Sequence, residues 1–151
     1  MPAMPSLDGS ESLVIDCSVT MAWYFKDEAT PYTNAVRAAL AAKRAAVPAL
    51  WPLEVANVLL MGERRKRSTQ TKATKWLRFL TALPIAVDTQ TPDLAFDTIL
   101  SLARSHKLTT YDAAYLELAM RLGVPLAAKD DALEKAALAV GVPLFTPPGT
   151  P

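Results

Sequence analysis

Four acidic residues stand where an expected strand or loop gives way to a helix. They are Asp16, Glu54, Asp112 and Asp130. Side chains at the carboxyl ends of parallel strands, or in the first turn of the following helix, converge on one crevice of an open α/β sheet. Carboxylates gathered there repel one another, and a divalent cation between them relieves that repulsion. Because an all-oxygen ligand set selects hard ions, the pattern predicts a Mg²⁺ or Mn²⁺ site.

Each of these acids also has an ordinary structural explanation when it is taken singly. Asp16 ends an apolar run and could cap a helix, and a carboxylate in a first helical turn, such as Glu54, gains about 0.3 to 1 kcal/mol from the helix dipole. Asn57 lies three residues after Glu54 on the same helix face, among neighbours that we expect to be buried. Asp112 lies in an apolar segment, where an unpaired carboxylate is costly to bury. Four acids at four crossover points therefore favour a functional site.

The adjacent pair Asp130 and Asp131 has to be divided between two roles. Asp131 and Glu134 are three residues apart and fit a capping box at the start of a helix. We therefore expect Asp131 to be the cap and Asp130 to face the crevice. The reverse assignment stays open from the sequence.

Strand and helix patterns alternate along the chain, which indicates a parallel sheet covered on both faces. Short apolar runs predict strands at 13–15, 46–47 and 85–87, and two Gly-Val-Pro-Leu repeats, at 123–126 and 141–144, each predict a helix stop, a turn and a strand. Helical spacing and helix-start residues predict helices from just after Asp16 to Phe25 and at about 30–44, 52–62, 69–82, 92–107, 110–122 and 131–140.

The composition indicates one soluble domain. A chain of 151 residues with 51% hydrophobic content can bury a core, and we divide it into a flexible leader (1–11), a single domain (12–146) and a flexible tail (147–151). The start lacks a signal peptide pattern, and no apolar run approaches the roughly 20 residues of a membrane-spanning helix. Cys17 is the only cysteine and His106 the only histidine, so an intrachain disulfide is excluded and His-based catalysis is disfavoured. We expect a cytoplasmic protein.

Basic residues crowd one stretch of a chain whose formal net charge is only +1. They are Arg64, Arg65, Lys66, Arg67, Lys72, Lys75 and Arg78. The candidates for contact with RNA phosphates are Arg64, Arg65, Arg67 and Lys72. A solvated helix face explains the stretch equally well.

Four segments of the chain resemble the motifs of the PIN-domain family, and more closely those of its VapC-type toxin ribonucleases. They are Val14–Val19, Trp51–Leu59, Leu108–Leu116 and Leu126–Asp130. Their order and spacing match, and they cover nearly the whole chain. One departure is Ala128, where family members often have Thr or Ser, so a hydrogen bond that would orient the fourth acid is missing.

The resemblance implies an α/β/α sandwich with a central, mostly parallel sheet. It also implies a Mg²⁺ or Mn²⁺ site, RNA as substrate, a homodimer, and a small VapB-type antitoxin protein as partner. It carries metal-site and catalytic roles onto Asp16, Glu54, Asp112 and Asp130. The supporting polar groups that it implies are Ser18, Asn57 and Thr110.

Metal-dependent hydrolysis of RNA is the function that these observations favour. Two other classes remain as alternatives. An aspartyl-phosphate phosphatase would have a second acid two residues after Asp16, where Ser18 stands, and a receiver domain would have a late Lys-Pro step, whereas Lys129 precedes Asp130. A non-catalytic RNA- or protein-binding module would use the acids only as caps and would need no cation.

Overall fold

The described part of the chain folds around one parallel sheet. The structure is a computed structural model that describes Leu7 and residues 11–148. Within these residues four strands pair in the order β3-β2-β1-β4. The strands are β1 (Leu13–Ile15), β2 (Ala45–Val47), β3 (Ile85–Val87) and β4 (Leu126–Ala127). Val14 lies beside Ala46 on one side and Leu126 on the other. Because all pairs are parallel, the carboxyl ends of the strands share one edge of the sheet.

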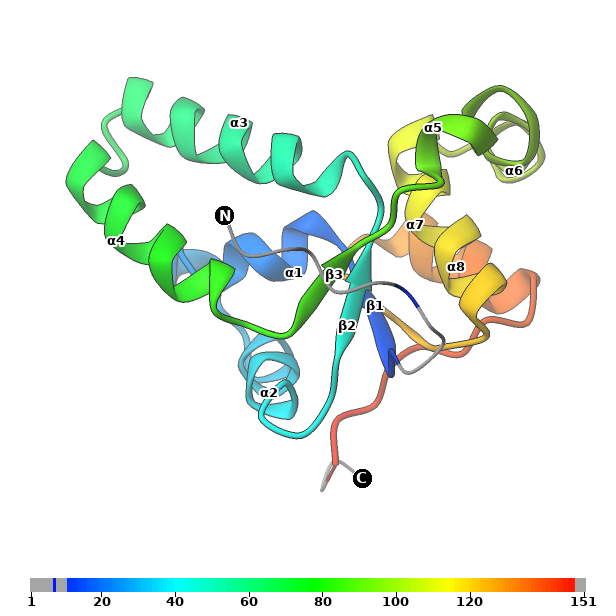
Figure 1. Ribbon diagram of the computed structural model, residues 1–151, viewed down its shortest axis with the longest axis horizontal. Coiled ribbons are helices and arrows are strands. Elements are labelled where there is room, and N and C mark those ends of the chain that lie inside the picture. Colours follow the sequence, from blue (N-terminus) through cyan, green and yellow to red (C-terminus); the bar gives the residue numbers. More distant parts are fainter. Residues whose placement is uncertain (1–6, 8–10, 149–151) are drawn as a thin grey trace.

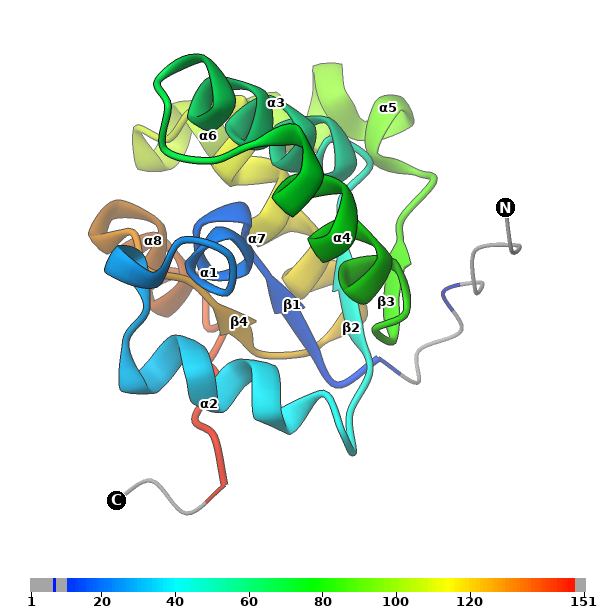
Figure 2. The same cartoon turned by 90° about the vertical axis from the view of Figure 1, so that its left-hand side faces the viewer.

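Helices cover both faces of this sheet. The helices are α1 (Cys17–Ala22), α2 (Pro31–Ala39), α3 (Trp51–Arg64), α4 (Gln70–Thr81), α5 (Thr91–Leu94), α6 (Leu100–His106), α7 (Thr110–Leu122) and α8 (Asp131–Ala139), with a 3₁₀ turn η1 (Lys26–Glu28) and a π-helical turn η2 (Ala95–Ile99). Figure 1 shows α1 to α4 on one side of the sheet and α5 to α8 on the other, and Figure 2 shows the first group in front. The predicted α/β sandwich with a parallel sheet is confirmed.

The core lies on both faces of the central strands. The side chains of β1 and β2 are fully buried, which explains why these strands are continuous apolar runs instead of alternating patterns. Tyr115, Leu116 and Leu118 of α7 join the same core. The buried helix α7 therefore has little freedom to move relative to the sheet.

Four predicted elements differ from the structure. The helix expected to reach Phe25 ends at Ala22. The helix expected at 30–44 ends at Ala39, because the chain must turn before it enters β2 at Ala45. The helix expected at 92–107 is interrupted by the π turn η2. The strand expected after Gly141 is reduced to a single parallel bridge between Leu126 and Leu144.

The predicted leader (1–11) and tail (147–151) fall mostly outside the described residues. The division into one domain with two flexible ends therefore stays a prediction. Among the described helices, none has the length and apolar character to cross a membrane.

Candidate active site

Asp16 is fixed at the carboxyl end of β1. Its backbone N–H donates to the Ala127 carbonyl at the end of β4, at 3.1 Å. Its Oδ1 accepts from the backbone N–H of Val19 at 2.9 Å, so Asp16 is the N-cap of α1. The Ser18 hydroxyl lies 2.9 and 2.8 Å from the two carboxylate oxygens. The cap and Ser18 together hold the buried carboxylate in one orientation.

Glu54 is positioned by contacts between α3 and two other helices. The Trp51 ring, at the start of α3, is buried and donates from Nε1 to the Thr20 hydroxyl of α1 at 3.0 Å. This bond holds the first turn of α3 against α1. The Tyr115 hydroxyl of α7 donates to Glu54 Oε1, and Glu54 therefore lies between the two helix layers.

Asp112 lies in the first turn of α7, as predicted. The hydroxyl of Thr109, the N-cap of α7, accepts from the Asp112 backbone N–H at 3.1 Å. A helix that leads into a parallel strand begins at the carboxyl edge of the sheet, and α7 precedes β4. Asp112 is half-buried, and among the described residues its carboxylate oxygens accept no hydrogen bond.

Asp130, and not Asp131, caps α8. Asp130 has extended backbone angles and accepts from the Leu133 N–H at 2.9 Å, whereas Asp131 is the exposed first residue of the helix. The expected capping box between Asp131 and Glu134 is wrong, because α8 begins one residue earlier than that box requires. Asp130 also lines the cavity at the carboxyl edge of the sheet, and only its Oδ2 serves the cap.

One cavity of about 390 Å³ collects these side chains at the carboxyl edge of the sheet. It is lined by Asp16, Cys17, Ser18, Met21, Glu28, Glu54, Val58, Asp112, Tyr115 and Asp130. The four predicted acids and Ser18 thus share one cavity. The other two supporting residues do not line it: Thr110 is exposed, and Asn57 lines a neighbouring pocket. The expectation that Asn57 has buried neighbours is wrong on its own face of α3, where Leu53, Ala56 and Leu60 are exposed.

Three carboxyl groups in this cavity, those of Asp16, Glu54 and Asp112, have raised pKa values. Burial raises the pKa of Asp16 to about 6, despite the bonds from Val19 and Ser18 that lower it, and the charge of Asp112 raises it further. Burial also raises the pKa of Glu54 and that of Asp112, and Asp130 adds to the shift of Asp112. A cation among these groups would favour their charged forms.

The donor chemistry of the cavity fits a hard divalent cation. The acids offer carboxylate oxygens, and the oxygens of Asp112 and Oδ1 of Asp130 accept no bond from the described residues. Across residues 7 and 11–148, however, no three His, Cys, Asp or Glu side chains are close enough to hold one ion together. Binding a cation would need side-chain rotation, and the ligand roles stay predictions.

Two residues beside the acids, Tyr115 and Glu28, had no site role predicted from the sequence. The Tyr115 hydroxyl bonded to Glu54 has a raised pKa, because of burial and the Glu54 charge, and so keeps its proton. Glu28 also lines the cavity, and the Lys129 ammonium donates to its backbone carbonyl at 3.0 Å. Glu28 had no signal in the sequence beyond its place in a polar turn.

Arg67, one of the four candidates for contact with RNA phosphates, is engaged by contacts within the protein. It pairs with Asp27 at 3.1 Å and with Glu28 at 3.2 Å, and its guanidinium lies 4.0 Å from the centre of the Phe25 ring. These contacts join the α3–α4 loop to η1 at the rim of the cavity. Arg64, Arg65 and Lys72 are exposed, so they keep their predicted availability for phosphate contact.

The raised pKa of Asp16 predicts how stability changes with pH. The folded pKa of about 6 exceeds the unfolded value of about 3.9, so the folded state binds the proton more tightly. This stabilisation is complete below about pH 4 and is lost as the pH rises through 6. We therefore expect Asp16→Asn to be more stable than wild type when a chelator removes metal ions. Its unfolding free energy should be higher by up to about 3 kcal/mol at pH 8 and equal at pH 4. Urea unfolding at both values checks this, and a difference independent of pH would contradict it.

Comparison with known proteins shows the family to which this chain belongs. Residues 13–138 match the family model described as PIN domain, so the chain belongs to the PIN-domain family. PIN domains are typically nucleases and usually use divalent metals. No curated protein sequence matches the chain significantly.

Two solved structures share the fold at low sequence identity. PAE2754 from Pyrobaculum aerophilum is 21% identical, with a TM-score of 0.59, covering 89% of this chain and 88% of that one. VapC20 from Mycobacterium tuberculosis, described as a toxin that cleaves the sarcin-ricin loop, is 17% identical, with a TM-score of 0.61, covering 90% of this chain and 100% of that one.

Proposed function

We propose that this PIN domain is a metal-dependent endoribonuclease that hydrolyses RNA phosphodiester bonds and is the toxin of a type II toxin–antitoxin pair. The observation that carries the proposal is the single cavity lined by Asp16, Glu54, Asp112 and Asp130. Helix capping explains Asp16 and Asp130 only in part, because each cap uses one carboxylate oxygen. It does not explain why four acids meet.

The residues of the cavity have different roles in the proposed reaction. Asp16, Asp112 and Asp130 would hold Mg²⁺ or Mn²⁺, and Glu54 would either join them or orient the attacking water. When bound, such an ion lowers the pKa of water and neutralises charge that develops on the phosphoryl oxygens. Ser18 keeps Asp16 in place, and the Tyr115 hydroxyl occupies Oε1 of Glu54, so Oε2 would be the oxygen that accepts from the water.

Cysteine chemistry does not compete with this mechanism. Burial, together with the charges of Glu54 and Asp16, raises the pKa of Cys17 to about 12. The thiol therefore stays protonated and is a poor nucleophile at neutral pH.

The toxin assignment and its partners rest on similarity to VapC20. By that similarity we propose an RNA substrate and a small VapB-type antitoxin protein, and from the resemblance of the four motif segments to VapC-type toxins we propose a homodimer. The fold alone is shared with VapC20 at this level of identity, so the RNA that is cut has to be found by experiment.

Mg²⁺ or Mn²⁺ should raise the thermal stability of the protein. A ligand that binds only the folded state stabilises it by about 2.7 kcal/mol at 100 times its Kd. Melting curves of wild type with each ion, beside Asp112→Asn, measure the effect, and the variant should respond less. Calorimetry that finds no binding to wild type at millimolar ion would reject the metal site, and a preference for Zn²⁺ over Mn²⁺ would reject the all-oxygen ligand set.

The exposed basic residues of α3 and α4 should give RNA binding its dependence on salt. Phosphate contacts release counterions, so binding weakens as salt rises. Replacing Arg64, Arg65 and Lys72 with Ala, in an Asp112→Asn background that prevents cleavage, should reduce the slope by up to about one unit per lost contact. Filter binding across salt concentrations measures it.

Arg67→Ala is the matched control for this series, because Arg67 is engaged by Asp27 and Glu28. It should leave the slope nearly unchanged. If the triple variant keeps the parental slope and affinity, the basic stretch is a solvated face or a surface for a protein partner.

A further inference from the structure

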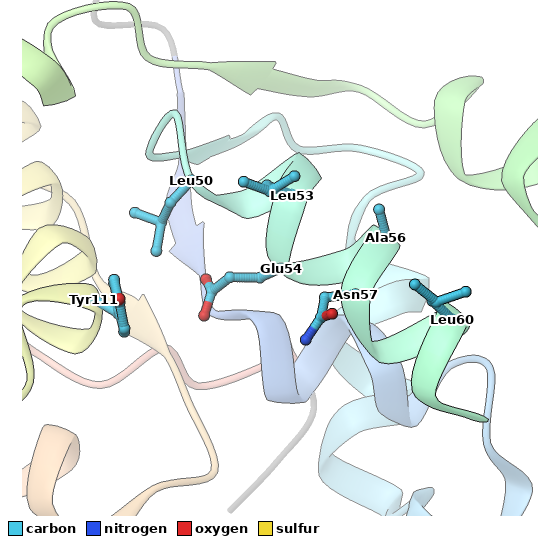
Figure 3. A pocket seen from close by; sticks show the side chains of 7 residues that line it. All are labelled: Leu50, Leu53, Glu54, Ala56, Asn57, Leu60 and Tyr111. Carbon is cyan, nitrogen blue, oxygen red and sulfur yellow. The ribbon is translucent and has the colours of Figure 1, made fainter. Parts of the chain in front are cut away.

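A second pocket adjoins the acidic cavity and shares one wall with it. It has a volume of about 640 Å³ and is lined by Leu50, Leu53, Glu54, Ala56, Asn57, Leu60 and Tyr111. Glu54 lines both this pocket and the acidic cavity. Figure 3 shows Tyr111 on α7 facing Glu54 across the gap from α3. The pocket and the acidic cavity therefore adjoin at this side chain.

The walls of the pocket suit a flat, neutral ring. Tyr111 is 63% exposed, and its hydroxyl has no hydrogen-bond partner among the described residues. Four aliphatic side chains form most of the remaining wall, and neither Lys nor Arg lines it. With Glu54 as the only charged lining residue, the pocket disfavours a phosphate and favours an uncharged group with apolar faces.

One amide completes the lining. Asn57 is exposed, and no described residue makes a hydrogen bond with its side chain. Figure 3 shows Glu54 and Asn57 leaving α3 on the same side, toward the pocket. An amide offers both a donor and an acceptor, the pair of groups needed to bind the edge of a nucleobase.

We propose that this pocket binds one nucleobase of the RNA, next to the phosphate held at the acids, and that it sets sequence preference. Tyr111 stacks on the base, and the Asn57 amide bonds to its edge. The inference rests on the proposed ribonuclease function. A nucleotide joins base and phosphate through one sugar, and the shared Glu54 wall provides that continuity. The exposed leucines could also contact a protein, and the test includes that outcome.

The test is RNA binding by Tyr111 variants in the Asp112→Asn background. The probes are labelled heptanucleotides of A, C, G or U, and an abasic ribose-phosphate heptamer. Stacking on an aromatic ring is worth about 5- to 150-fold in affinity, so Tyr111→Ala should weaken the best-bound heptamer by that factor and leave the abasic one unchanged. Tyr111→Phe should keep the affinity, and Asn57→Leu should reduce the differences among the four sequences.

Phe96→Ala is the matched control, because Phe96 is a 93% exposed aromatic on η2 that does not line the pocket. It should leave binding of all the heptamers unchanged. Equal affinities in Tyr111→Ala and its parent would overturn the inference. A second result would also overturn it: Leu53→Ser changes the oligomeric state measured by light scattering, while Tyr111→Ala binds RNA normally. The pocket would then be a protein contact.

The two proposals fail in different ways. If wild type cleaves RNA but Tyr111→Ala keeps the parental affinities and cleavage sites, the base pocket is wrong and the nuclease stands. If wild type does not cleave and Asp112→Asn binds none of the heptamers, the nuclease is wrong and the base pocket falls with it.

Discussion

Asp16→Asn should reach the same fold, with at least wild-type stability at neutral pH, and cleave RNA at least about 100-fold more slowly. Asparagine caps a helix about as well as aspartate, so the bond from Val19 and the start of α1 survive. The lost charge removes a cation ligand, whose contribution to catalysis is worth several kcal/mol, and each 1.36 kcal/mol is tenfold in rate. Cleavage of a labelled RNA under single-turnover conditions, together with a urea unfolding curve, measures both quantities.

Two further variants separate catalysis from capping. Asp16→Ala should lose activity and also the cap, which costs about 0.5 to 2 kcal/mol. Asp131→Asn should change neither, because Asp131 is exposed, does not line the cavity and does not cap α8. An Asp16→Asn variant with wild-type activity would mean that Asp16 is only a cap.

Arg121→Ala should destabilise the protein by about 3 to 5 kcal/mol. Arg121 of α7 bonds Asp88, which follows β3, and Glu117, one turn earlier on α7, where its Nε lies 2.9 Å from Glu117 Oε2. Asp88 is 1% exposed and Glu117 5%. Removing the guanidinium leaves two buried carboxylates without their cation. Urea unfolding at pH 7 measures the loss.

Companion variants test whether the cause is the unpaired charge. Arg78→Ala removes an exposed arginine from the last turn of α4 and should change stability by less than about 0.5 kcal/mol. The triple variant Asp88→Asn, Glu117→Gln, Arg121→Met has no charge at any of these three positions. It should recover most of the unfolding free energy that Arg121→Ala loses. If the triple variant is as unstable as Arg121→Ala, lost packing and not the unpaired charge causes the destabilisation.

Local patterns made the sheet and much of the site predictable. Apolar runs three residues long mark β1 and β3, and an acid directly after such a run has to lie at the carboxyl edge. The N-cap hydrogen bond between Thr109 and the Asp112 backbone N–H joins residues three apart in the sequence, so it could be predicted locally. For these residues the local signal and the tertiary position agree.

Contacts between distant residues were not predictable. Asp88 and Arg121 are 33 positions apart, and Arg67 meets Asp27 across 40, so nothing near either arginine reveals its partner. The cap was assigned to Asp131 instead of Asp130 because the start of α8 was placed one residue too late. Asn57 was misjudged because the helix face that it shares with Leu53 is uncovered.

Cleavage of total cellular RNA by the purified protein, with Mg²⁺ or with chelator, tests the central claim most directly. Asp112→Asn, prepared in the same way, controls for contaminating nuclease, since Asp112 lines the acidic cavity without a hydrogen bond to its carboxylate from the described residues. We expect defined fragments from wild type with Mg²⁺, none with chelator, and none from the variant. Equal cleavage by wild type and Asp112→Asn, or cleavage that persists in chelator, would contradict the assignment of these acids to metal-dependent RNA hydrolysis.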